Sequence, residues 1–130
     1  MNSKAVLDIL LQAIPSLSAV YLFGSQASGH AGPDSDVDLA ILADAPPDAL
    51  ALWTLSGRLA QVLDRHVDLL DLRAASTVMQ YRIITTGERL WVRGSGPLLY
   101  ESFILGEKTR LDEARSALLE DIKKTGTIYG

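Results

Sequence analysis

The sequence predicts an α/β (α+β) fold in which helices flank a small mixed sheet. Short apolar runs at 19–23, 37–42 and 67–72 indicate buried strands, and they alternate with segments whose apolar residues recur at helical spacing. Glycine, proline and aspartate stand where these segments start and stop. With 130 residues, 48% of them hydrophobic, the chain can build one core. We therefore expect a single domain over 1–130.

The individual elements follow from spacing and from breakers. A helix over 4–14 stops at Pro15, and a helix over 50–63 has Asp48 as a possible cap and an apolar side at Leu52, Leu55, Leu59 and Val62. A helix over about 74–86 ends at Gly87, and 90–92 is expected as a short edge strand. The remaining segment, 98–123, is predicted to be a C-terminal helical region.

Composition and charge exclude several classes of protein. The net charge of -4 gives no basic field, so direct binding of nucleic acid is not expected. The absence of cysteine excludes disulfides and thiolate metal sites and fits a reducing compartment. No apolar run approaches the length of a membrane span. A cytoplasmic protein that makes no use of a membrane is the expectation.

Two acids on one strand are the first candidate functional residues. Side chains alternate along a strand, so Asp36 and Asp38 share a face while Val37 and Leu39 point to the other. Two carboxylates about 7 Å apart along the backbone repel unless a cation lies between them. Mg²⁺ binds one or two carboxylates together with substrate phosphates. The pair therefore predicts a metal–phosphate site.

A Gly-Ser pair precedes the acids at the end of the strand 19–23. A helix could begin at Ser25, and its N-terminus behind Gly24 would offer backbone N–H groups and a hydroxyl to a phosphate. The long connection between this strand and Val37 contains Gly29, Gly32 and Pro33, and connections of that length are often functional. The strand, the Gly-Ser turn and the acids thus follow one another so that a single bound triphosphate could contact both the turn and the acids.

A third acid is expected from the strand VDLLDL at 67–72. Asp68 and Asp71 are three positions apart, so they face opposite sides and only one of them can join the site. Asp71, at the end of the strand, is well placed to cap the following helix, which leaves Asp68 as the third carboxylate. Asp34 is interpreted as a loop residue. The alternative is that Asp34 and Asp36 cap the loop and Asp38 is merely solvated.

Together these residues resemble a known family. Gly24-Ser25, then Asp36-Val37-Asp38, and an acid in a later strand are similar to the signature of the nucleotidyltransferase superfamily shared with DNA polymerase beta. The runs GSQASG, DSDVDLAIL and VDLLDL resemble the minimal nucleotidyltransferase (MNT) group, whose members are often antitoxins encoded beside HEPN-domain toxins. The resemblance covers residues 4–92 well and implies a polymerase beta-like nucleotidyltransferase fold.

The resemblance also implies an activity. It implies transfer of AMP from ATP with Mg²⁺, in a two-ion arrangement, where Gly24 and Ser25 hold phosphates and Asp36, Asp38 and Asp68 hold metal. Asp68 would also help to deprotonate the attacking hydroxyl. The implied acceptor is a tyrosine of a HEPN ribonuclease toxin, in a hetero-oligomer.

Two alternatives stay open. Relatives often read GSxARG where this chain has Ser28, and the missing arginine favours an antitoxin that acts by binding the toxin without catalysis. A nucleotidyltransferase for small molecules, such as aminoglycosides, is the other alternative, although it predicts a substrate-binding extension that the sequence lacks. His30 could contact a phosphate, but a loop histidine is more often solvated.

The last predicted helix has an apolar stripe at Leu111, Ala114, Leu118 and Ile122, widened by Leu119. The stripe could pack on the protein's own sheet or face a partner, and the same two readings apply to the segment 98–105. Trp53 and Trp91 are interpreted as core or edge packing.

Overall fold

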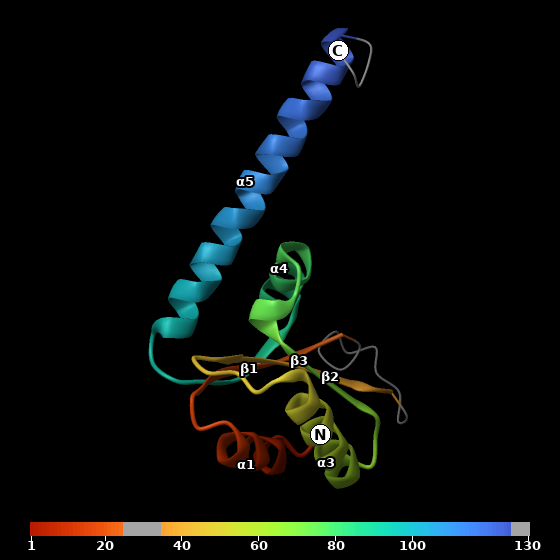
Figure 1. The fold of residues 1–130 in the computed structure, drawn as a ribbon, viewed down its shortest axis with the longest axis vertical. Coiled ribbons are helices and arrows are strands. Elements are labelled where there is room, and N and C mark those ends of the chain that lie inside the picture. The colour runs from red at the N-terminus through yellow and green to blue at the C-terminus, as the bar shows by residue number, and fades with distance from the viewer. Residues whose placement is uncertain (25–34, 126–130) are drawn as a thin grey trace.

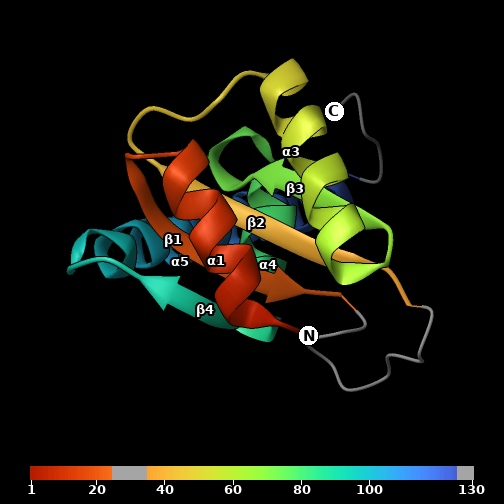
Figure 2. The ribbon, with the colours of Figure 1, turned by 90° about the horizontal axis from the view of Figure 1, so that it is seen from below.

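The computed structural model describes residues 1–24 and 35–125. Helices α1 and α3 cover one face of a four-stranded sheet, and α4 and the beginning of α5 cover the other (Figures 1 and 2). The elements are α1 (Ser3–Ala13), β1 (Leu17–Phe23), β2 (Val37–Ala43), α3 (Ala49–Leu63), β3 (Val67–Asp71), the 3₁₀ helix η1 (Leu72–Ala74), α4 (Thr77–Thr86), β4 (Glu88–Val92) and α5 (Gly96–Thr125).

The sheet is mixed, as the sequence predicts. Its strand order is β3-β2-β1-β4, with β1 antiparallel to both of its neighbours and β2 parallel to β3. The predicted edge strand is confirmed, because β4 borders one side of the sheet. Strand β3 forms the other edge.

Alternation along the strands divides the interior into two cores. Val37, Leu39 and Ile41 of β2 pack with α1 and α3, whereas Ala40 and Leu42 pack on the opposite face near α4. Both β1 and β2 are buried on both faces, which explains why their sequences are almost continuously apolar.

Polar caps fix where the helices begin. Asp48 caps α3, since its Oδ1 accepts a hydrogen bond from the Ala51 N–H at 2.8 Å, and this prediction is confirmed. The predicted helix over 74–86 begins later, at Thr77. The reason is local: residues 72–74 form η1, and Ser76 caps α4 through the Met79 N–H.

One prediction for α3 is wrong. Trp53 was expected to pack in the core or at an edge, but it is 75% exposed. It lies two residues from buried Leu55, roughly 200° around the helix, so it lies outside both cores. Val62, expected on the apolar side, is also 49% exposed in the last turn. Trp91 is partly buried against the α1 and α3 core, as expected.

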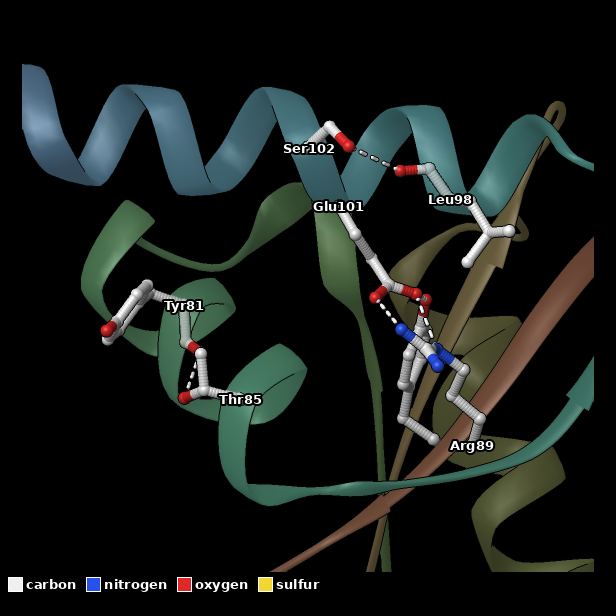
Figure 3. A network of polar contacts seen from close by, with 7 residues as sticks. Tyr81, Thr85, Arg89, Leu98, Glu101 and Ser102 are labelled. Atoms are coloured by element: carbon white, nitrogen blue, oxygen red, sulfur yellow. Dashed lines mark hydrogen bonds and ion pairs between the residues drawn. The ribbon is translucent and has the colours of Figure 1, made fainter.

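Helix α5 packs on the body over its first half, as far as Lys108, whose ammonium lies 5.0 Å from the centroid of the Tyr81 ring of α4. Glu101 and Ile104 are buried in this part, and Glu101 accepts a hydrogen bond from the Tyr21 hydroxyl at 2.9 Å. It also accepts one from Arg89 Nε at 2.8 Å (Figure 3). Further along, the helix projects away from the sheet (Figure 1). The stripe residues Leu111, Leu118 and Leu119 are exposed, so they do not pack on the protein's own sheet.

None of the helices in the described ranges is long and apolar enough to cross a membrane.

Candidate active site

The predicted acids lie on neighbouring strands at one end of the sheet. Asp38 pairs in register with Asp68 of β3 on one side and with Phe23 of β1 on the other. Gly24 directly follows Phe23, and Asp36 directly precedes β2. The sheet therefore brings together the end of β1 and the starts of β2 and β3, which are far apart in the sequence.

The acids also share a face of the sheet. Asp38 alternates in step with Ala40 and Leu42, and Asp68 with Leu70, all on the side that carries α4. Asp38 is partly buried, whereas Asp36 and Asp68 are exposed. Asp38 is thus the central acid, flanked by two more accessible ones.

This arrangement raises the pKa of Asp38 above its ordinary value. Partial burial is the largest cause, followed by the negative charges of Asp68 and Asp36 and by a hydrogen bond with Asp68. The charge of nearby His66 opposes the shift. The three acids therefore repel one another when all are ionised, and a bound cation would relieve that repulsion.

Gly24 has a role that the sequence did not reveal. Its φ is +73°, a conformation that favours glycine, and a Cβ at this position would lie 2.4 Å from Asp38 Oδ2. The interpretation from sequence was that Gly24 frees the backbone toward a phosphate. The structure adds that the missing side chain leaves room for the carboxylate of Asp38.

His66 is a neighbour of the site that sequence reasoning missed. Its Nε2 lies 3.4 Å from Asp68 Oδ1, and both side chains are largely exposed. The signal was available, because a residue two positions before Asp68 in an extended segment points to the same side.

The remaining predictions divide into two groups. Asp71 is confirmed as a cap, since its Oδ1 accepts a hydrogen bond from the Arg73 N–H at 3.1 Å at the start of η1. The residues of the predicted connection at 25–34 lie outside the described residues, among them Ser25, Ser28, Gly29, His30, Gly32, Pro33 and Asp34.

Within residues 1–24 and 35–125, no three histidine, cysteine, aspartate or glutamate side chains form a group that could hold a metal ion by themselves. This observation is compatible with Mg²⁺, which takes one or two carboxylates and completes its shell with water and substrate phosphates. The mutual repulsion at Asp38 is the feature of this structure that fits a cation.

Comparison with known proteins assigns the family. Residues 6–95 match the family model described as polymerase beta, nucleotidyltransferase. The chain belongs to this nucleotidyltransferase family. All three acids, Gly24 and the four strands lie within the matched range.

Relatives of this nucleotidyltransferase include two proteins called protein adenylyltransferase MntA. The one from Shewanella oneidensis is 36% identical over 94% of this chain and 88% of its own length. The one from Aphanizomenon flos-aquae is 24% identical, over 88% of this chain and 83% of its own.

Solved structures agree with the family and its fold. A toxin–antitoxin crystal structure with AMP-PNP matches with a TM-score of 0.84 at 36% identity, over 95% of this chain and 99% of the matched one. A structure of a tri-AMPylated Shewanella oneidensis HEPN toxin in complex with an MNT antitoxin matches with a TM-score of 0.77 at 34% identity, over 94% and 96%. The expected polymerase beta-like fold is confirmed.

Proposed function

We propose that this nucleotidyltransferase is a protein adenylyltransferase that transfers AMP from ATP to a hydroxyl of a HEPN ribonuclease toxin and so acts as its antitoxin. The observation that carries the proposal is the register of Asp38 with Asp68 beside Gly24. Support also comes from relatives, which are named adenylyltransferases, and from similar structures of a toxin–antitoxin with AMP-PNP and of a tri-AMPylated HEPN toxin with an MNT antitoxin.

In this proposal the catalytic work is divided among the residues of the site. Asp36 and Asp38 would hold Mg²⁺, with Asp68 contributing to a second ion, and the metal supplies charge neutralisation for the phosphates. Gly24 and Ser25 would hold phosphates of ATP. The acceptor hydroxyl oxygen attacks the α-phosphorus, the bond to the β-phosphate breaks, and pyrophosphate leaves. Asp68, the exposed acid, accepts the hydroxyl proton.

The proposal covers the chain as one functional unit. The family match ends at residue 95, and α5 begins at Gly96. We propose that 1–130 acts as a single minimal nucleotidyltransferase domain, with α5 as its C-terminal helical region, in the cytoplasm and in a complex with the toxin.

A labelling experiment tests the proposal. The protein is incubated with the product of the neighbouring gene, which the proposal predicts to be the HEPN protein, together with Mg²⁺ and ATP labelled at the α-phosphate. We expect label on the HEPN protein, lowered by more than about a hundredfold in Asp36→Ala and in Asp38→Ala. Asp44→Ala is the matched control, because Asp44 is exposed at the opposite end of β2 and should label normally. A stable complex without any label would instead identify an antitoxin that acts by binding alone.

A further inference from the structure

A large groove runs along the outer side of β3, and apart from Asp68 its lining has no part in the nucleotide and metal roles proposed above. We call it the β3 groove; its volume is about 1060 Å³. One wall is α3 and the other is formed by η1 and the start of α4. Its apolar lining includes Leu52, Trp53, Ala60, Ala74, Ala75 and Met79.

The groove opens into the candidate active site. Asp68 and His66 line it, and Asp68 is also the register partner of Asp38. A molecule at the Asp68 end of the β3 groove therefore contacts the acid that is proposed to accept the hydroxyl proton. The attacking hydroxyl must lie next to the acid that takes its proton. The groove is therefore on the side of the site from which the acceptor reaches the α-phosphate.

The floor of the groove is a strand edge that can form hydrogen bonds. Strand β3 pairs with β2 alone among the strands of the described ranges. The Val37 N–H donates to the His66 carbonyl at 2.9 Å, so alternation turns the N–H and C=O groups of Val67 and Leu69 away from β2. Such an edge is a template for an added extended peptide.

Trp53 gives the groove an apolar anchor away from Asp68. Three residues, 64–66, join the end of α3 to the start of β3, so Trp53, in the first turns of α3, lies toward the Asp71 end of the strand. Its exposed indole contributes to neither core. Exposed tryptophans in a groove are typical of binding hot spots.

We infer that the β3 groove binds the acceptor as an extended peptide segment that pairs with the free edge of β3. The inference rests on the proposed function. The segment's hydroxyl residue lies at Asp68, and an apolar residue further along the segment packs on Trp53. Five strand residues span about 17 Å, so the two contacts lie within one short segment. Specificity then depends on residues next to the modified one as well as on that hydroxyl.

The test compares Trp53→Ala with Leu50→Ala in the labelling reaction, using the HEPN protein and ATP as the two varied substrates. Both side chains are exposed on α3, at 75% and 71%, but Leu50 lies outside the groove. We expect Trp53→Ala to raise the KM for the HEPN protein at least about tenfold, with the KM for ATP unchanged. Leu50→Ala should match the wild type in both.

Hydrogen exchange on the unaltered protein gives a second measurement. Adding the HEPN protein together with a non-hydrolysable ATP analogue should slow exchange of the Val67 and Leu69 amides, because they would be hydrogen-bonded to the segment. This readout does not depend on how any variant folds.

Three results would overturn the inference. The first is an unchanged KM for the HEPN protein in Trp53→Ala. The second is an increase in the KM for ATP alone, which would assign the groove to the nucleotide base. The third is unaltered hydrogen exchange at the Val67 and Leu69 amides. A wild-type protein that transfers no label would refute the proposed function itself, so the two failures are distinguishable.

Discussion

At the scale of single residues, the side chain of Asp38 packs against the backbone of Gly24 at the end of β1. Gly24→Ala places a methyl group 2.4 Å from Asp38 Oδ2 and forces alanine to a φ of +73°. We expect the Asp38 carboxylate to move, transfer of AMP to be largely lost, and the free energy of unfolding to fall by about 1–2 kcal/mol. Labelling and urea denaturation measure the two effects.

Gly106→Ala is the matched control for this prediction. Gly106 lies within α5, and a Cβ there would meet no atom within 4 Å. Because alanine favours helix more than glycine does, this change should raise the free energy of unfolding by about 0.5–1 kcal/mol and leave transfer intact. Full activity in Gly24→Ala would contradict the close packing of Gly24 against Asp38.

Asp38 also predicts a dependence of stability on pH. Its folded-state pKa is raised, so ionised Asp38 destabilises the metal-free protein above that pKa, and the penalty disappears as the pH falls toward the ordinary aspartate value. Asp38→Asn removes the charge at every pH. We expect it to raise Tm by about 2–4 °C at pH 7 and to have a shrinking effect toward pH 4.

Thermal unfolding in the presence of a chelator measures this difference, with Asp44→Asn as the control. Asp44 is exposed, so its amide variant should unfold like the wild type at both pH values. A lower Tm for Asp38→Asn at pH 7 would mean that the carboxylate stabilises the empty site.

At the scale of elements, Glu101 joins α5 to two strands. Its buried carboxylate accepts hydrogen bonds from Tyr21 of β1 and from Arg89 of β4. Burial, together with the hydrogen bond to Glu101, raises the pKa of Tyr21, so its hydroxyl stays protonated and remains a donor. Glu101→Ala leaves the Tyr21 hydroxyl and Arg89 without their acceptor. We expect a loss of about 1–3 kcal/mol of unfolding free energy, measured in urea.

Glu107→Ala provides the comparison on the same helix. Glu107 pairs at 3.0 Å with Arg110, whose side chain is 66% exposed, and such surface pairs contribute little to the free energy of unfolding. Equal effects of the two substitutions would show that Glu101 does not anchor α5.

Periodicity predicted the elements, and it placed the acids together, because it reports which residues share a face. Asp36, Asp38 and Asp68 were found this way, and the caps at Asp48 and Asp71 follow from the position of an acid before a helix. Periodicity does not report whether another element covers that face. Trp53 was therefore misplaced, the stripe on α5 stayed ambiguous, and the contact between Gly24 and Asp38 required the strand register.

At the scale of the whole molecule, one end of α5 packs on the rest of the protein and the other end projects into solvent. Its 30 residues span about 45 Å, and the buried residues along its described part, Pro97, Glu101 and Ile104, lie near its start. The effect of a substitution in α5 on the free energy of unfolding should therefore depend on its position along the helix. Ile104 is 3% exposed, and Ile104→Ala should lower the free energy of unfolding by about 2–4 kcal/mol.

Leu118 is the counterpart on the projecting half. It is 58% exposed, so Leu118→Ala should change the free energy of unfolding by less than about 0.5 kcal/mol. Urea denaturation of the two variants at the same protein concentration measures the contrast directly. A loss at Leu118 comparable with that at Ile104 would show that the stripe is covered in solution, and a dependence of that loss on protein concentration would identify a second copy of the chain as the cover.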